Sequence, residues 1–233
     1  MIQKNLLKLS ASVITIFSII HNANANLEID KLNLNHEVIA KYENGGKGYE
    51  AITKDNYGGY SYGKWQISTK KNNGKASTFD SFLLYLKQYH KPFYVKLMNA
   101  GGYPSAFKGD THFSKVWIDL SRRKDFQQAY DDFILRTQIY PAYRAFEKKR
   151  NDEFDKIIAW AIEDSTVQAG VNSAIIQHGP GGCKKLLTSL VAMKDLTTKE
   201  KFLKDLYSLR KSRYAKYTKR YKSEYYDLTN NNL

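Results

Sequence analysis

The sequence predicts a mainly α-helical protein with one small β element, and two observations support this. Apolar side chains recur at helical spacing through most of the 233 residues, and a glycine-dense stretch at residues 42–63 interrupts them. Hydrophobic residues make up 42% and charged residues 26% of the chain, a composition typical of folded globular proteins. The lone cysteine, Cys183, excludes an intramolecular disulfide framework, so the fold must rest on its hydrophobic core.

The N-terminus has the pattern of a secretory signal peptide. Lys4 and Lys8 precede an apolar run at residues 13–20, and the small residues Ala23-Asn24-Ala25 follow at the positions that a signal peptidase reads. The apolar run is shorter than the about 20 residues that span a bilayer. We therefore expect residues 1–25 to be removed and residues 26–233 to form one domain without a transmembrane segment. Such a protein would be exported to the periplasm or the extracellular space.

Apolar side chains at positions i, i+3, i+4 and i+7 predict a series of core-facing helices along the rest of the chain. Their apolar stripes lie at residues 79–89, 126–134, 154–162, 167–175, 186–191 and 202–206. Ser77 and Asp125 precede the first two stripes, and Thr197 with Glu200 forms a capping box before the last. The run Gly179-Pro180-Gly181-Gly182 is expected to end the helix before it.

The glycine-dense stretch is predicted to form loops and one small β element between Tyr57 and Ile67, where apolar residues alternate. Glycine permits positive φ and lets a backbone come close to a ligand. In a helical protein this stretch is therefore a favoured surface for a functional site, with an ordinary turn-rich connection as the alternative.

Two carboxylates in this region point to chemistry on a glycosidic bond, which needs a proton donor of raised pKa and often a second carboxylate. Glu43 follows the apolar positions Val38 and Ile39 of a helix expected to begin near Asn35. It should therefore lie at the edge of the core, where partial desolvation raises a carboxyl pKa. Asp55 opens the second glycine-rich loop and is the candidate for the second carboxylate, with a turn-forming role as the alternative.

Two runs in this stretch, Tyr42–Gly48 and Gly58–Gln66, also carry a resemblance to a known family. They resemble the signature Tyr-Glu-Ser-Gly-Gly, spacer, Gly-Gly-Val-Ser-Tyr-Gly-x-Tyr-Gln. This signature belongs to the lysozyme-like domains found at the C-terminus of type VI secretion spike proteins and in related phage proteins. Residues 164–170, 177–182 and 207–224 resemble later blocks of that family in order, so the resemblance covers about residues 36–228.

The resemblance implies a lysozyme-like helical fold and hydrolysis of the glycan of peptidoglycan, with Glu43 matching the catalytic glutamate. The chain departs from the family in the spacer. The family usually has Asp-Pro directly before the paired glycines and uses that aspartate as its second proposed carboxylate, whereas this chain has Asn56-Tyr57 there and Asp55 one place earlier. A protein acting through Glu43 alone would instead resemble a lytic transglycosylase. A cell-wall-binding module with an inactive site is the third interpretation.

The segment after the paired glycines is predicted to form one wall of a sugar-binding cleft that faces Glu43. Gly59 and Ser61 belong to this wall, and Gly63 would let the backbone approach the sugar. In an alternating strand Tyr62 and Gln66 lie on the same face, so both are predicted to contact the glycan.

The resemblance places three further residues on the opposite side of this cleft: Gln168, Gln177 and His178. Roles at a helix surface and a helix end are the alternatives for them. The five histidines show neither a His-x-x-x-His pair nor a partner cysteine, so no metal site is expected. Nucleotide-binding and serine-hydrolase motifs are also missing from the sequence, and no cofactor is predicted.

The formal net charge of +14 suggests an acidic partner. The basic C-terminal segment is interleaved with tyrosines, but Tyr214, Tyr217, Tyr221 and Tyr225 are spaced as the core face of a helix. We therefore expect anionic wall polymers rather than nucleic acid to be the partner. The predicted protein is a monomer that acts on peptidoglycan, with a secretion-apparatus or immunity partner as a further possibility.

Overall fold

The structure is a computed structural model that describes residues 29–34, 37–56, 58–71, 76–149, 151–193 and 196–230. In this part of the chain the protein is mainly helical with a small antiparallel sheet, which confirms the predicted fold class. The predicted signal peptide and the expected helix start near Asn35 lie outside the described residues. None of the helices described combines the length and the hydrophobicity that a membrane span requires.

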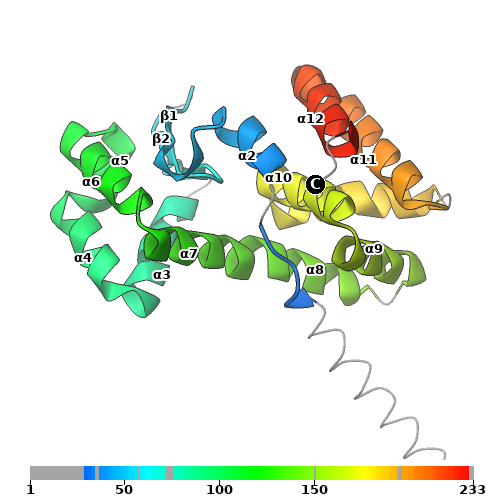
Figure 1. Cartoon of the computed structure of the whole chain (residues 1–233), viewed down its shortest axis with the longest axis horizontal. Helices are drawn as coiled ribbons and strands as arrows, with labels where there is room; N and C mark the ends of the chain where they lie inside the picture. The colour runs from blue at the N-terminus through cyan, green and yellow to red at the C-terminus, as the bar shows by residue number, and fades with distance from the viewer. Residues whose placement is uncertain are drawn as a thin grey trace, which may run out of the picture.

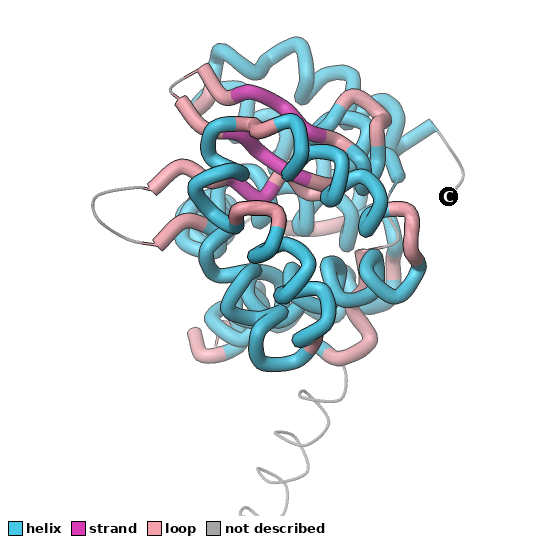
Figure 2. The backbone as a smooth tube through the Cα atoms, turned by 90° about the vertical axis from the view of Figure 1, so that its left-hand side faces the viewer, coloured by secondary structure: helices cyan, strands magenta, loops and turns pink. Residues whose placement is uncertain are grey.

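The β element is a three-stranded sheet of strand order β1-β2-β3, and Figure 2 shows its short strands among helices. Its strands are β1 (Ile52–Lys54), β2 (Tyr60–Tyr62) and β3 (Ile67–Ser68). Tyr62 of the central strand pairs with Ile52 on one side and with Ile67 on the other. The connection from β2 to β3 is a tight turn over residues 63–66.

Four helices follow the sheet in sequence (Figure 1); the first and third of them contact its strands, and the other two pack on neighbouring helices. They are α3 (Thr78–Tyr89), α4 (Lys91–Asn99), α5 (Gly102–Lys108) and α6 (Thr111–Ser121). Ser77 begins α3 as predicted, because its hydroxyl accepts a hydrogen bond from the Asp80 backbone while the Asp80 carboxylate accepts one from the Ser77 backbone. The side chain of Asp110 caps α6 in a similar way.

A nearly continuous helical rod joins this half of the molecule to the other half (Figure 1). It consists of α7 (Lys124–Ile134), the π-helical turn η2 (Leu135–Ile139) and α8 (Tyr140–Glu147). Pro141 lies in the first turn of α8 and has no backbone N–H to donate. The wider turn before it is the local adjustment by which a helix continues past such an interruption.

The second half of the molecule is helical and includes the short helix that comes before the sheet in sequence. Its elements are α2 (Glu37–Asn44), α9 (Asp152–Glu163), α10 (Ser165–Ala192), α11 (Lys199–Arg213), the 3-10 turn η3 (Ala215–Tyr217) and α12 (Thr218–Asn230). The 3-10 turn η1 (Gly48–Glu50) then leads from α2 to the sheet. Helix α2 packs against α10 and α12, so the predicted catalytic glutamate meets the C-terminal helix.

Three local predictions need correction. Thr198 rather than Thr197 caps α11, because its hydroxyl accepts a hydrogen bond from the backbone of Lys201. The helix expected to end at Gly179 is only interrupted there: Gly179 has a non-helical φ of 69° and ψ of 168°, and α10 resumes at the next residue. The tyrosine stripe near the C-terminus does not lie on one helix, since η3 separates α11 from α12 and leaves Tyr217 exposed.

Candidate functional site

Glu43 lies at the C-terminal end of α2, where the helix gives way to two glycines. Val38 and Ile39 anchor the helix in the core, and Gly45 and Gly46 adopt φ values of 69° and 80° that a side chain would strain. The side chain of Glu43 has a relative exposure of 11%. The sequence therefore ends a short helix at the position that holds this carboxyl at the edge of the core.

The partner of Glu43 comes from the other end of the chain. Arg220 on α12 donates a hydrogen bond from its Nη2 atom to Oε1 of Glu43 and another from Nε to Oε2 of Glu224, at 3.1 Å. Burial raises the pKa of Glu43, and the nearby guanidinium of Arg220 only partly offsets this. The raised pKa favours the protonated carboxyl that a general acid must have at the start of a reaction.

A fully buried ion pair holds Arg220 in place. Glu224 accepts hydrogen bonds from Nη1 of Arg210 at 3.3 Å and from the Tyr207 hydroxyl at 2.6 Å, and it also contacts the Ser173 hydroxyl. Both side chains of the Arg210–Glu224 pair have an exposure of 0%. Burial opposes ionisation of Glu224, but the two guanidinium groups outweigh it and lower the pKa of this carboxyl. Glu224 is therefore a fixed negative charge behind Arg220.

Gln177 and His178 belong to the same network, and their predicted place on the opposite wall of a sugar cleft stays a prediction. Oε1 of Gln177 accepts hydrogen bonds from Arg210 at 2.8 Å and from the Tyr221 hydroxyl at 3.0 Å. The ring of His178 stacks on that of Tyr214 with their centroids 4.1 Å apart. Burial, together with the charges of the two nearby arginines, lowers the pKa of His178 to about 4, so its imidazole is neutral at pH 7. Both residues are half-buried.

Sequence reasoning assigned no role to the arginine–glutamate network, although a signal for it was present. Glu224 is the only acidic residue between Asp205 and Asp227, in a segment that is otherwise strongly basic. It also follows Arg220 by four residues, the spacing at which side chains meet on one face of a helix. A lone acid at that spacing is a reasonable candidate for a buried ion pair.

Asn44 was also missed, and it joins α2 to the sheet. Its side-chain amide donates a hydrogen bond to the carbonyl of Lys64 at 2.8 Å, and its side-chain oxygen accepts one from the backbone of Gly48 at 3.3 Å. Asn44 is buried and directly follows Glu43. The turn between β2 and β3 is thus fixed relative to the predicted catalytic glutamate.

Asp55 lies at the end of β1 and is held by hydroxyl groups of the other two strands. Its carboxylate accepts hydrogen bonds from the Ser61 hydroxyl at 3.0 and 3.1 Å and from the Ser68 hydroxyl at 3.1 Å. Its backbone also forms the turn to β2, since its N–H donates to the carbonyl of Gly59 and its carbonyl accepts from Gly58. The turn-forming role considered for Asp55 is therefore real, and its carboxylate is oriented as well.

The structure contradicts the predicted role of Tyr62 in sugar binding. Its side chain has an exposure of 0%, its hydroxyl donates a hydrogen bond to the carbonyl of Ala106 at 2.8 Å, and its ring packs against Phe79 and Trp117. The expected alternation fails because β2 ends at Tyr62 and the chain turns before Gln66. Tyr62 and Gln66 therefore do not belong to one strand, and strand alternation does not place their side chains on the same face.

Replacing Tyr62 with phenylalanine is expected to reduce stability rather than activity. The variant leaves the buried Ala106 carbonyl without its hydrogen bond, which costs about 1–3 kcal/mol in the free energy of unfolding. Urea denaturation followed by tryptophan fluorescence measures this change. A loss of lytic activity per folded molecule with unchanged stability would restore Tyr62 to the site.

The other residues of the predicted wall serve the protein's own packing. Ser61 is buried and its hydroxyl is committed to Asp55. A Cβ atom at Gly63 would lie 2.7 Å from the Tyr130 ring, and one at Gly59 would lie 2.7 Å from the Thr69 hydroxyl oxygen. The close backbone approach predicted at these glycines is thus to other parts of this chain.

The predicted sugar contacts of Gln66 and Gln168 differ in how well they fit the structure. Gln66 is half-buried and has a φ of 52°, an uncommon conformation for a residue other than glycine, and its amide donates to the Gly63 carbonyl at 2.9 Å. It stays a candidate for sugar contact. Gln168 was expected to line the cleft, but it is 4% exposed and its amide donates to the Ala161 carbonyl at 2.9 Å, so burial removes it from the site.

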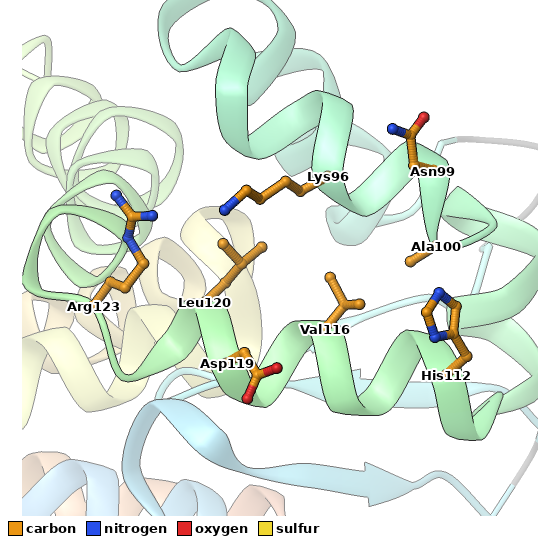
Figure 3. Close-up of a pocket in the computed structure, with 8 residues that line it drawn as sticks. All are labelled: Lys96, Asn99, Ala100, His112, Val116, Asp119, Leu120 and Arg123. Carbon is orange, nitrogen blue, oxygen red and sulfur yellow. The ribbon is translucent and has the colours of Figure 1, made fainter.

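A hollow on the other half of the molecule lies away from these residues. It lies between α4 and α6, has a volume of about 340 Å³ and is drawn in Figure 3. Lys96 extends over Leu120 there, with Arg123 at one end and His112 at the other (Figure 3). None of the residues that line this hollow belongs to the predicted site.

The candidate residues form two groups: Glu43, a carboxyl 11% exposed beside the Arg220 guanidinium, and Asp55, a carboxylate oriented by two hydroxyl groups of the sheet. Within the described residues, no group of three or more His, Cys, Asp and Glu side chains is placed to hold a metal ion. The carboxylate of Asp55 accepts its hydrogen bonds from Ser61 and Ser68, whereas that of Glu43 pairs with Arg220, so within the described residues the two carboxylates belong to separate networks. Chemistry at this site would rest on proton transfer between carboxyl groups and a substrate.

Comparison with known proteins identifies the family to which this chain belongs. No curated protein sequence matches the chain. A family described as type VI secretion system spike protein VgrG3-like, C-terminal, matches residues 36–230, which contain both carboxylates and the arginine–glutamate network. This confirms the resemblance seen in the glycine-dense stretch: the chain belongs to the VgrG3-like C-terminal family of type VI secretion spike proteins.

Proposed function

We propose that the protein cleaves the glycan backbone of peptidoglycan, with Glu43 as the general acid. The observation that carries this proposal is the placement of Glu43: a carboxyl 11% exposed at the end of α2, whose pKa burial raises. A carboxyl held in this way supplies the proton that a glycosidic oxygen needs as its bond to the anomeric carbon breaks. Family membership supports the choice of a wall-directed substrate.

Arg220 has a distinct part in this step. Once Glu43 has given its proton to the leaving oxygen, its carboxylate is negative and lies against the guanidinium of Arg220. The same contact lowers the energy of the ionised form, so the acid is weak enough to start protonated and strong enough to release its proton. Glu224 fixes Arg220 from behind and prevents it from turning away.

Asp55 decides between two outcomes after the bond breaks. In hydrolysis, a water molecule adds its oxygen to the anomeric carbon. Its proton goes to a second carboxylate, or it returns to the ionised Glu43 while the second carboxylate stabilises the positive charge on the sugar. In a lytic transglycosylase, a hydroxyl of the muramic acid residue attacks instead and gives its proton to Glu43. We favour hydrolysis because Ser61 and Ser68 orient the carboxylate of Asp55 as a catalytic group requires.

The test of this choice is Asp55→Asn. If the enzyme is a hydrolase, the variant should lose about 10²-fold or more in kcat, because it lacks the second carboxylate. Mass spectrometry of fragments released from purified peptidoglycan should then show reducing ends for the wild type. Anhydro ends, together with full activity of Asp55→Asn, would identify a transglycosylase. Binding to the wall with no fragments from the wild type would identify the non-catalytic module instead.

We further propose that the protein acts outside the cytoplasm as a monomer on peptidoglycan. The expected signal peptide and the family both support export, and the family supports an association with a secretion apparatus. An immunity partner that blocks the site would fit the same setting. Fractionation of cells that produce the full chain, with detection of the mature N-terminus by mass spectrometry, tests the export step.

A further inference from the structure

The C-terminal hairpin of α11 and α12 contains a long segment with one sign of charge. Between Leu206 and Glu224 the sequence has seven basic residues and no acidic ones. Arg210 and Arg220 point inward, where they pair with Glu224 and Glu43. The other five basic side chains are half-buried or exposed, and no ion pair joins them to a carboxylate of the described residues.

This segment is fixed to the second part of α10, which adds to the charge. Nη1 of Arg213 donates to the Lys185 carbonyl at 3.5 Å, and Nη2 of the same residue contacts the Ser189 hydroxyl. Helix α10 itself has no acidic residue. We define the basic surface as the solvent-facing cations at this end of the molecule: Lys185, Lys211, Arg213, Lys216, Lys219 and Lys222.

The basic surface and the candidate site share helix α12 and the segment before it. Tyr214, between Arg213 and Lys216 in sequence, stacks on His178. Arg220 turns toward Glu43, whereas Lys219 and Lys222 are exposed on other faces of α12, since residues one and two positions apart on a helix do not share a face. The positive charge therefore lies across α12 from Glu43, about one helix diameter of 10–12 Å away, a span that a flexible group on a bound polymer can cover.

The side chains of the basic surface determine which chemical groups of a ligand it can bind. Lysine ammonium groups on flexible stems act as point charges and bind carboxylates without a fixed geometry. A site of this kind suits anions carried on flexible tethers, and the peptide stems attached to peptidoglycan glycan carry free carboxylates. Exposed positive charge beside a site also raises the rate of encounter with an anionic substrate.

We propose that the basic surface binds the carboxylates of the peptide stems on the glycan strand that is being cleaved. This inference rests on the proposed function and adds a preference: the enzyme acts faster on glycan that carries its peptides than on bare glycan. The stems reach the basic surface around α12, whose inner side carries Arg220 and meets Glu43.

The experiment compares Lys211→Gln/Lys216→Gln/Lys219→Gln/Lys222→Gln with a control of equal charge loss. The control is Lys87→Gln/Lys91→Gln/Lys96→Gln/Lys108→Gln, whose side chains are exposed on the other half of the molecule. The substrates are intact wall sacs and glycan strands from which an amidase has removed the peptides. Each protein's kcat/KM is measured on both substrates at low ionic strength.

We expect the ratio of kcat/KM on intact glycan to that on bare glycan to fall about tenfold in the first variant and by less than about twofold in the control. Equal losses on both substrates, equal losses in both variants, or no loss would overturn the inference. Co-sedimentation with intact sacs gives a second reading that needs no catalysis. If the wild type releases no fragments, the proposed function fails, yet weaker sedimentation of the first variant alone would still support stem binding.

Two controls separate this partner from other polyanions. Binding of the same proteins to phosphatidylglycerol vesicles and to duplex DNA is measured at matched salt. A variant that loses affinity for vesicles or DNA while it keeps full affinity for intact sacs would overturn the inference in favour of a lipid or nucleic-acid surface. The inference is supported if the variant binds intact sacs more weakly than the wild type does, and if the two proteins bind equally once the stem carboxylates have been amidated.

Discussion

Replacing Glu43 with glutamine is expected to lower the rate of peptidoglycan cleavage by about 10²- to 10⁴-fold, the contribution of a positioned general acid. Glutamine has nearly the same shape and its amide oxygen can still accept the hydrogen bond from Arg220, so the site should keep its geometry. The release of soluble fragments from purified sacs, measured by mass spectrometry, gives the rate. A variant with more than half of the wild-type rate would remove Glu43 from the mechanism.

The stability of this variant provides the matching control. A carboxyl whose pKa is raised by folding contributes stability that is fully present below its unfolded pKa, about 4.3, and that is lost as the pH rises through its folded pKa. Above the unfolded pKa, the carboxyl of Glu43 therefore contributes less and less stability, and at neutral pH Glu43→Gln should unfold at the same urea concentration as the wild type or a higher one. Lost activity in a destabilised variant would indicate a structural role instead.

Replacing Glu224 with glutamine is expected to cause the largest loss of stability. Glu224 and Arg210 are both 0% exposed, and removal of one charge leaves the other buried without its counterion. Breaking a buried pair in this way costs about 3–5 kcal/mol in the free energy of unfolding. Guanidinium denaturation measures the change. Glu50→Gln is the matched control, because its partner Arg122 is exposed and such pairs contribute about 0–1 kcal/mol.

The pH dependence of this effect has the opposite sign to that of Glu43. The pKa of Glu224 is lowered by folding, so its contribution to stability is present above the unfolded value of about 4.3 and is lost as the pH falls through the folded pKa. The gap in stability between wild type and Glu224→Gln should therefore be largest near neutral pH and shrink in acid. A gap that does not change with pH would show that packing, rather than charge, makes Glu224 important.

Local sequence determined the helical character of the protein and the position of Glu43. Apolar periodicity identifies a helix wherever one face must be buried, and the stripes at residues 79–89 and 126–134 lie on α3 and α7. Paired glycines at positive φ end α2 directly after Glu43, so the edge-of-core placement of this carboxyl follows from neighbouring residues alone. The family signature in the same stretch is likewise local.

Only the tertiary structure decided what surrounds Glu43, because its partners come from distant segments. Arg220 follows Glu43 by 177 residues in sequence, and no local pattern brings α12 against α2. Tyr62 and Gln168 have polar groups that suit sugar binding, but their hydrogen bonds to backbone carbonyls are made within the core. A polar group costs free energy in the interior unless a partner meets it, and whether one does depends on the packing of elements far apart in the chain.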